Sequence, residues 1–198
     1  MEADFAKKVI DRLMPHFDCK AEQWSEDGKS RIDFIVTDKV YGKPFGLEFK
    51  DFNHKRGVNL GDHLLQSMRY ACSKFKVNGK YQHIPVLICP PISYNFLMCP
   101  VPESMILSTS AFGDGDREFF HDRHRKDHEH HTVNGMIGSL GVGEIRTQAV
   151  KEHRYMRFVF SNKALWEERP YHNSKKPIGL NLKNYEFQMS KEIGFRFL

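Results

Sequence analysis

The chain has 198 residues, of which 40% are hydrophobic and 13% aromatic, which is enough apolar material to bury a core in one domain. It has no run of about 18 apolar residues and no apolar signal-peptide core at its N-terminus, so we expect a soluble, cytoplasmic protein without a membrane partner. The formal net charge of +5 is compatible with a polyanionic partner but does not require one.

The N-terminal part of the chain predicts a helix followed by three strands. Apolar residues recur at helical spacing from Phe5 to Phe17, which predicts an amphipathic helix over residues 3–17. Runs with strand character follow it and are separated by polar turn sequences. We place the three strands at residues 19–25, 31–37 and 45–50.

A second helix and a buried strand come next. Asn59 could cap a helix whose apolar stripe continues through Phe75, so we expect it to end near residue 76, before Asn78-Gly79. The run IPVLICPP at 84–91 has no charge and is bounded by prolines, which favours a strand covered on both faces of a mixed sheet. The predicted element order is therefore α-β-β-β-α-β.

Charged residues interrupt the second and third predicted strands. Strand alternation would place Ile32, Phe34 and Val36 on one face and Asp33 on the other. In the next strand, the same alternation separates the apolar residues from Glu48 and Lys50. If the two strands pair as a hairpin with Val36 opposite Phe45, Asp33 lies opposite Glu48, with the two Cβ atoms about 5 Å apart.

Two carboxylates at this separation either share a proton or bind a cation. Mg²⁺ suits the pair because it takes one or two carboxylates, keeps several waters and adds a substrate phosphate. Lys50 would point to the same side as Glu48, where it could orient or deprotonate a water held by the metal. The alternative is a set of solvated groups or a cross-strand ion pair on an exposed hairpin face.

These residues resemble a known family. Asp33, a gap of fourteen residues, and Glu48-Phe49-Lys50 within the predicted order are similar to the PD-(D/E)XK nuclease superfamily, although Ile32 stands where the motif name has proline. The resemblance implies a restriction-endonuclease-like fold in which Asp33 and Glu48 bind Mg²⁺ or Mn²⁺. It also implies a further ligand, the main-chain carbonyl of Phe49, and a Lys50 that positions the nucleophilic water.

A second match lies in the second predicted helix. Gln66 and Tyr70, in "QSMRY", resemble the QxxxY element of the RecB-like and phage-exonuclease branch, and a spacing of four places them on one helix face. The resemblance implies that they support the active site or the DNA backbone near it, while the alternative is the polar side of an amphipathic helix. The family often has a fourth acidic residue, for which Glu2, Asp11 and Glu22 are candidates and Glu22 is preferred.

A basic loop follows the Glu48–Lys50 strand. His54, Lys55 and Arg56 are residue types that contact phosphates, so we expect them at the rim of a nucleic-acid site, unless the loop only faces solvent. Further along, His121, His124, His128 and His131 would form one stripe on a helix. This stripe could be a solvated helix face, a phosphate contact or a metal site.

The rest of the second half gives weaker signals. The glycine-rich stretch 135–143 lacks a P-loop or dinucleotide-binding context and predicts a flexible or closely packed turn. Residues 144–150 and 154–160 predict a hairpin, in which Arg146, Arg154 and Arg157 could extend a basic surface. A last strand is expected near 194–198. The four cysteines form no CxxC pair, which favours buried free thiols in a reducing compartment: Cys19, Cys72, Cys89 and Cys99.

The sequence thus predicts an α/β protein with a mixed (α+β) sheet, consisting of a core at 1–91 and an α+β extension at 92–198 in the same domain. We expect a metal-dependent nuclease acting on phosphodiester bonds, with double-stranded or branched DNA favoured over RNA and endo- or exonuclease action left open. A bacterial or phage-encoded enzyme and a homodimer are both compatible with it. The alternatives are a catalytically inactive nuclease-like module that binds nucleic acid or a protein, and a histidine-rich metal-binding protein.

Overall fold

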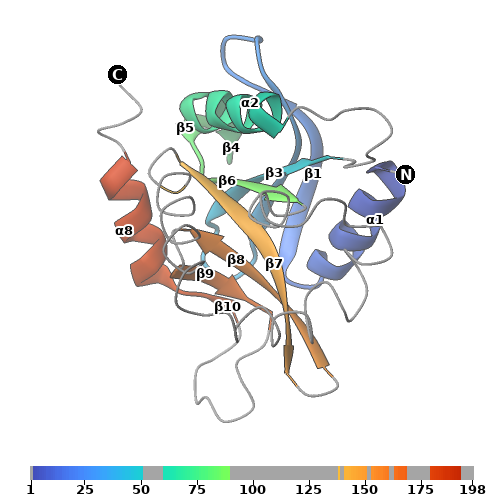
Figure 1. The fold of residues 1–198 in the computed structure, drawn as a ribbon. Helices are drawn as coiled ribbons and strands as arrows, with labels where there is room; N and C mark the ends of the chain where they lie inside the picture. The colour runs from blue at the N-terminus through green and yellow to red at the C-terminus, as the bar shows by residue number, and fades with distance from the viewer. Residues whose placement is uncertain are drawn as a thin grey trace, which may run out of the picture.

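The computed structural model shows a mixed α+β fold whose strands form one large curled sheet and a separate hairpin (Figure 1). The structure describes residues 2–50, 60–89, 138, 141–150, 153–160, 163–168 and 179–192. The elements in chain order are α1 (Glu2–Leu13), β1 (Phe17–Trp24), β2 (Arg31–Asp38), β3 (Pro44–Phe49), α2 (Leu60–Cys72), β4 (Lys74–Val77), β5 (Lys80–His83), β6 (Val86–Cys89), β7 (Val142–Val150), β8 (His153–Phe160), β9 (Lys163–Glu167), β10 (Gly179–Leu180) and α8 (Leu182–Glu192).

Within the described residues, the large sheet has eight strands in the order β1-β2-β3-β6-β7-β8-β9-β10. Strands β1 to β3 are antiparallel neighbours, β6 is parallel to both β3 and β7, and β7 to β10 are again antiparallel. Val36 lies opposite Phe45 in the β2–β3 pair, so the predicted hairpin register is confirmed. The sheet therefore continues through β6 from the first half of the chain into the second.

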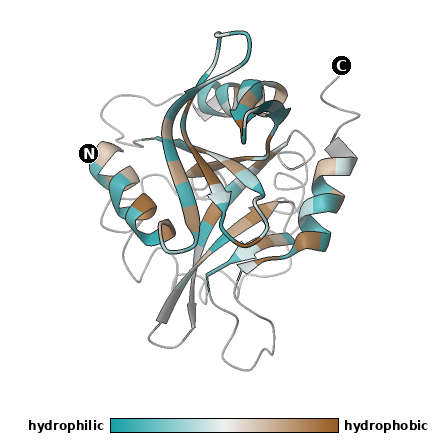
Figure 2. Cartoon of the chain, turned by 180° about the vertical axis from the view of Figure 1, so that it is seen from behind, coloured by the Kyte–Doolittle hydropathy of each residue, from teal (hydrophilic) through white to brown (hydrophobic). Residues whose placement is uncertain are grey.

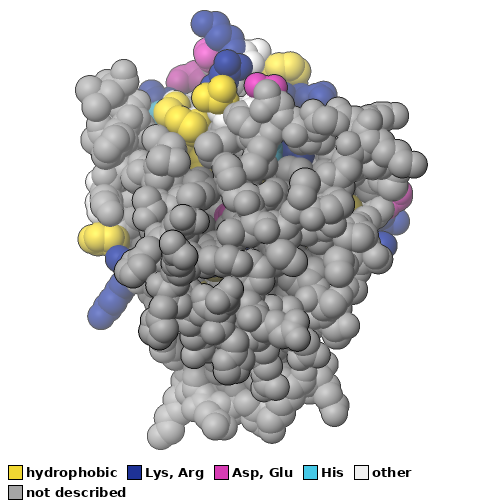
Figure 3. Space-filling view, in the orientation of Figure 1, with side chains coloured by type: hydrophobic (Ala, Val, Ile, Leu, Met, Phe, Trp, Pro, Cys, Tyr) yellow, Lys and Arg dark blue, Asp and Glu magenta, His cyan; other side chains and the backbone are white. Residues whose placement is uncertain are grey.

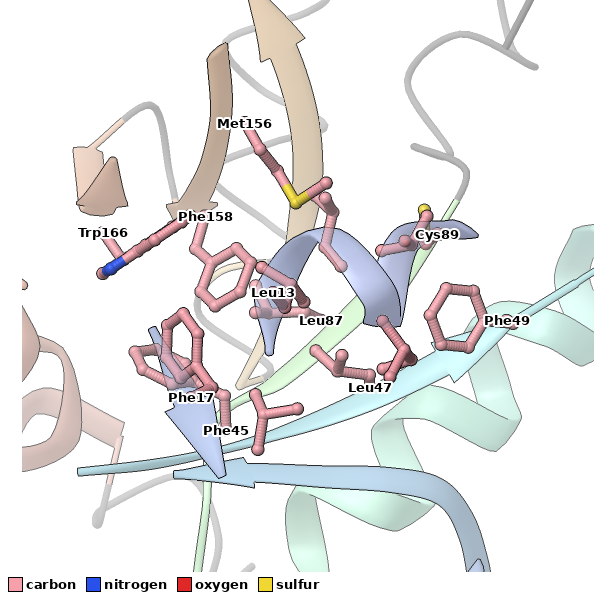
Figure 4. Close-up of a cluster of buried hydrophobic side chains, with 14 of the residues drawn as sticks. Leu13, Phe17, Phe45, Leu47, Phe49, Leu87, Cys89, Met156, Phe158 and Trp166 are labelled. Carbon is pink, nitrogen blue, oxygen red and sulfur yellow. The ribbon is translucent and has the colours of Figure 1, made fainter. Parts of the chain in front are cut away.

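Each face of the sheet carries its own apolar core. On one face, α1 and α8 cover a cluster rich in aromatic rings, in which Phe17, Phe45 and Phe158 lie together (Figure 4). On the other face, α2 and β4 of the β4–β5 hairpin pack against apolar residues of β2, β6 and β7. Figure 2 shows the matching alternation of hydrophobic and hydrophilic residues along α1 and the strands.

The first helix ends earlier than the sequence predicts. It stops at Leu13, and a turn over residues 14–16 leads into β1, so the expected helical position of Phe17 is wrong. Pro15 explains the difference, because proline cannot continue the main-chain hydrogen bonds and disfavours a helical residue before it. Phe17 is nevertheless buried, with 1% of its surface exposed, but it reaches the core from a strand.

The second helix also ends early, at Cys72, and an unpredicted hairpin follows it. Asn78 and Gly79 have φ angles of 51° and 83°, and both central residues of a type I′ turn need such positive values. These two residues therefore connect β4 to β5 rather than stop a helix. Phe75, expected on the helix, lies in β4 opposite Gln82 and is completely buried.

The strand in 84–91 is confirmed as β6, and all four of its residues are buried. The hairpin expected at 144–150 and 154–160 is confirmed as β7 and β8. The glycine stretch ends in close packing, because a Cβ atom at Gly143 would lie 2.4 Å from the Phe160 ring. The strand expected at 194–198 and the histidine segment at 121–131 lie outside the described residues.

Helix α8 was not predicted. It begins after Asn181, whose side-chain oxygen accepts a hydrogen bond from the Asn184 amide at 3.1 Å, a typical N-cap contact. Its Tyr185 packs on Phe45 and donates a buried hydrogen bond to the carbonyl of Pro44. The C-terminal helix is thus fastened to β3, the strand that carries Glu48.

The cysteine prediction is correct in part. Cys19, Cys72 and Cys89 are free thiols, but only Cys89 is fully buried, whereas Cys19 is half-buried and Cys72 is exposed.

None of the three described helices is long and apolar enough to cross a membrane. Figure 3 shows charged and hydrophobic side chains together at the top of the molecule, where Figure 1 places the β1–β2 turn and α2.

Candidate active site

Strand β3 places Glu48 on the α2 side of the sheet. Glu48 is in parallel register with Ile88 of β6, and Ile88 belongs to the core beneath α2. Residues in register on neighbouring strands have side chains on the same face, so the Glu48 carboxyl also lies under α2. Only 1% of Glu48 is exposed. The glutamate is therefore buried, not a solvated group on an open hairpin.

Asp33 binds β3 through its side chain. The main-chain pairing of β2 with β3 ends at Phe34 and Leu47, one step before the expected Asp33–Glu48 pair. Instead, Asp33 Oδ2 accepts a hydrogen bond from the main-chain amide of Phe49 at 2.8 Å. This bond holds the Asp33 carboxylate at the end of β3, next to Glu48.

The predicted alternation of β2 is wrong at Ile32. Phe34 and Val36 contact the core under α1, but Ile32 packs with Ile35 in the core under α2. The β1–β2 pairing also skips the step that would join Glu22 to Asp33, and Glu22 has a left-handed φ of 48°. We attribute the change of face to this local irregularity of the two strands.

The Glu48 carboxyl is held by Lys50 and is strongly perturbed. Lys50 Nζ donates a hydrogen bond to Glu48 Oε1 at 2.5 Å. Burial, and then the charge of Asp33, raise the pKa of Glu48 from 4.5 to about 8, and the opposing effect of Lys50 does not cancel the rise. Oε2 is buried without a hydrogen-bond donor among the described residues.

Helix α2 brings three polar side chains to this carboxyl. Gln66 Nε2 donates a hydrogen bond to the Tyr70 hydroxyl oxygen, so the two residues do lie on one helix face, while their support of an active site stays a prediction. Burial raises the pKa of Tyr70, and the charge of Glu48 adds to the rise. Since this effect requires proximity, the phenol lies close to the carboxyl groups.

His63 is the third of these side chains, and no role was predicted for it. It is 2% exposed, and burial followed by the charge of Lys50 lowers its pKa to about 3. The imidazole is therefore neutral at physiological pH and adds no charge to the site. Its position one helical turn before Gln66 is the only sequence signal that connects it with the site.

The structure does not choose a fourth acidic residue. Glu22 is exposed and lies 3.7 Å from Arg31 in an ion pair, and Asp11 is exposed on α1. The side chain of Glu2 is not described. His54, Lys55 and Arg56 also lie outside the described residues, so their contact with nucleic acid stays a prediction.

Asp33 and Glu48 are the side chains of this site that could hold a metal ion. The described residues contain no cluster of three or more His, Cys, Asp or Glu side chains that could hold a metal. Asp33 and Glu48 nevertheless provide two neighbouring carboxyls, and the Glu48 oxygen without a donor offers a position for a cation. Two carboxyl ligands would be compatible with Mg²⁺, which usually takes one or two carboxylates and keeps several waters.

Strand β7 adds a pair that the sequence analysis did not place here. Glu144 is in register with Ile88, and therefore lies on the same face as Glu48. It is 2% exposed, and Arg146 donates to Glu144 Oε2 from Nε at 2.9 Å and from an Nη atom at 2.6 Å. The Arg146 guanidinium is bound to a buried glutamate but its side chain is 27% exposed, so its part in a basic surface stays a prediction.

Comparison with protein-family models, with curated proteins and with solved structures found no match to this chain. Any assignment of function consequently rests on the geometry of Asp33, Glu48, Lys50 and the α2 side chains.

Proposed function

We propose that the protein is a metal-dependent nuclease that hydrolyses phosphodiester bonds, with DNA as its substrate. In this proposal α1, β1 to β3, α2 and β6 form a restriction-endonuclease-like core. The observation that carries it is the buried Glu48 carboxyl, which lies between Asp33 and Lys50 and has a pKa of about 8. Burial of such a group costs stability, and strongly perturbed carboxyls are common at functional sites.

Asp33, Glu48 and the main-chain carbonyl of Phe49 would hold Mg²⁺ or Mn²⁺. When bound, such a cation supplies positive charge to the scissile phosphate and makes an attacking water more acidic. The two carboxyls provide oxygen ligands for the cation, with Glu48 losing its proton as the cation binds, and the hydrogen bond of Asp33 with the Phe49 amide limits how far the ligands must move.

Lys50 would orient the attacking water and balance charge in the transition state. Its side chain is 24% exposed, whereas its partner Glu48 is 1% exposed, so the ammonium group connects the buried carboxyl to solvent. An ammonium group has three N–H donors, and its bond to Glu48 uses one of them.

The α2 side chains would complete the site without adding charge. Because Gln66 donates to the Tyr70 oxygen, the phenolic hydrogen is directed to another acceptor, such as a carboxylate or a phosphate oxygen. Neutral His63 and the apolar residues of the α2-side core surround the carboxyl with groups that carry no charge. A low local dielectric strengthens every charge interaction in the site.

The alternative is an inactive nuclease-like module that binds nucleic acid or a protein. The Glu48–Lys50 hydrogen bond favours it, because a carboxyl that is protonated or paired with an ammonium does not need a cation. The nuclease and the inactive module differ in whether Glu48 and Lys50 take part in catalysis. A cleavage assay separates them.

The experiment incubates linear, circular, branched and single-stranded DNA with the wild type in Mg²⁺, Mn²⁺ or Ca²⁺. We expect cleavage with Mg²⁺ or Mn²⁺, none with Ca²⁺, and loss of cleavage in Lys50→Ala with the fold retained by circular dichroism. Lys74→Ala is the matched control, because Lys74 is also paired with a glutamate, Glu26 at 3.8 Å. DNA binding without cleavage of any substrate would support the inactive module, and full activity of Lys50→Ala would refute the assigned site.

A further inference from the structure

Two strands of the sheet carry the same short pattern. Glu48-Phe49-Lys50 ends β3 and Glu144-Ile145-Arg146 lies near the start of β7, so each segment has a glutamate, an apolar residue and a basic residue. In both, the basic side chain binds the glutamate two residues before it, at 2.5 Å for Lys50 and at 2.6 Å for Arg146. The pattern is therefore repeated in contacts as well as in sequence.

The two segments are also aligned in space. Ile88 of β6 is the register partner of Glu48 on one side and of Glu144 on the other, and both pairings are parallel. The glutamates consequently lie on one face at the same level, about 10 Å apart, since neighbouring strands are about 4.8 Å apart. Lys50 and Arg146 follow two residues later, towards the same end of the sheet.

Burial divides each segment in the same way. Side-chain exposure is 1% for Glu48 and 3% for Glu144, but 24% for Lys50 and 27% for Arg146. The middle residues, Phe49 and Ile145, belong to the core on the opposite face. Each basic group is thus anchored by a buried carboxylate at a point that solvent can reach.

This arrangement fixes the position of the Arg146 guanidinium. Its contacts with Glu144 involve Nε and one Nη nitrogen, whereas a guanidinium carries five N–H groups in a rigid plane. Among the described residues, N–H groups beyond those bound to Glu144 make this guanidinium suited to phosphate, which arginine can bind through two parallel hydrogen bonds. Arg157, the cross-strand partner of Arg146 on β8, is paired with Glu167 at 2.8 Å and continues the line of basic groups.

We propose that Arg146 binds a phosphate next to the scissile one, on the nucleic-acid strand that is cleaved at Asp33, Glu48 and Lys50. Glu144 is its positioning residue, and the bound strand crosses the sheet from β3 towards β8. The inference rests on the proposed function for the identity of the cleaved bond. Binding of the nucleic-acid backbone by Arg146 can be tested separately from cleavage.

The main test uses the double variant Glu144→Gln/Arg146→Gln, because removal of Arg146 alone would leave Glu144 buried without its charged partner and could unfold the protein. Binding of a fluorescent DNA oligonucleotide is measured by anisotropy in Ca²⁺ over a range of salt concentrations. We expect the affinity for DNA to fall about tenfold, because one hydrogen bond between charged groups is lost. The slope of log affinity against log salt concentration (the salt slope) should shrink by about 1. In Mg²⁺, KM should rise while kcat changes little.

Two further variants keep the test decisive. Arg146→Lys retains the charge, so it should keep the salt slope but lose affinity, because lysine lacks the planar pair of donors. The matched control is Arg12→Gln/Glu168→Gln, which removes a similar Arg–Glu pair, joined at 2.6 Å, from the α1 side of the molecule. This control should bind DNA like the wild type.

The outcomes distinguish the two proposals. Unchanged affinity and salt slope in a folded Glu144→Gln/Arg146→Gln variant would overturn the role of Arg146, even if the wild type cleaves DNA. A wild type that binds DNA through Arg146 but never cleaves it would overturn the proposed nuclease function and retain the phosphate contact. Absence of DNA binding by the wild type would overturn both.

Discussion

Replacement of Glu48 by glutamine should make the metal-free protein more stable at high pH. The folded protein raises the pKa of Glu48 from 4.5 to about 8, so between these values the folded state holds a proton that the unfolded state has lost. Stability from this proton is fully present below pH 4.5, decreases as the pH rises, and is lost above about pH 8. Glutamine keeps the shape of the protonated acid and never ionises.

The size of the effect follows from the two pKa values. Each tenfold change in proton affinity is worth about 1.4 kcal/mol. The rise of the pKa from 4.5 to about 8 therefore means that the free energy of unfolding of the wild type falls by about 5 kcal/mol between low and high pH. This is comparable to the whole free energy of unfolding of many domains, about 5–15 kcal/mol. Glu48→Gln should avoid this loss completely.

The assay is urea unfolding in EDTA at pH values from 5 to 9. We expect the free energy of unfolding of Glu48→Gln to exceed that of the wild type by an amount that grows with pH and levels off above pH 8. Glu186→Gln is the control, because the Glu186 side chain is 60% exposed and its replacement should change stability by less than about 0.5 kcal/mol at every pH. Parallel pH curves for the wild type and Glu48→Gln would refute the reasoning.

Two more predictions follow from the same structure. Mg²⁺ binding at pH 7 should release about one proton from Glu48 and almost none at pH 9 or above, which calorimetry in buffers of different ionisation enthalpy would detect; absence of release at pH 7 would mean that Glu48 is not a ligand. Gly143→Ala should destabilise the protein by about 1–3 kcal/mol in thermal or urea unfolding, because the new Cβ would lie 2.6 Å from the Val159 carbonyl oxygen. Gly46→Ala should cost less, since its nearest neighbours are the tips of isoleucine side chains, and equal losses would argue against this packing.

The feature that the sequence predicted best is the register of β2 and β3. A slip by one residue would move Phe45 and Leu47 from the α1-side core to the opposite face of the sheet, so the alternation along β3 determined the pairing with Val36. The uncharged run at β6 was likewise sufficient to predict a strand with both faces covered. The spacing of Asp33, Glu48 and Lys50 then placed these side chains in one region of the molecule.

Other features depend on contacts that local patterns do not encode. By its spacing, Phe75 could continue the apolar stripe of α2 or lie on the buried face of β4. Only recognition of Asn78-Gly79 as a hairpin turn favours the strand over the helix. Helix α8 has its N-cap at Asn181, but its aromatic residues gave no clear period. The alignment of Glu144 with Glu48 requires β6 to lie between two strands that are far apart in the chain.

The position of β6 has a consequence for synthesis of the chain on the ribosome. Its four apolar residues acquire β3 as a neighbour early, but their other edge pairs with β7, which starts at Val142. At about 5–20 residues per second, translation reaches β7 only several seconds later. During this interval β6 is an uncovered apolar edge that can pair with another nascent chain. Premature termination before β7 should therefore yield aggregates rather than a smaller folded protein.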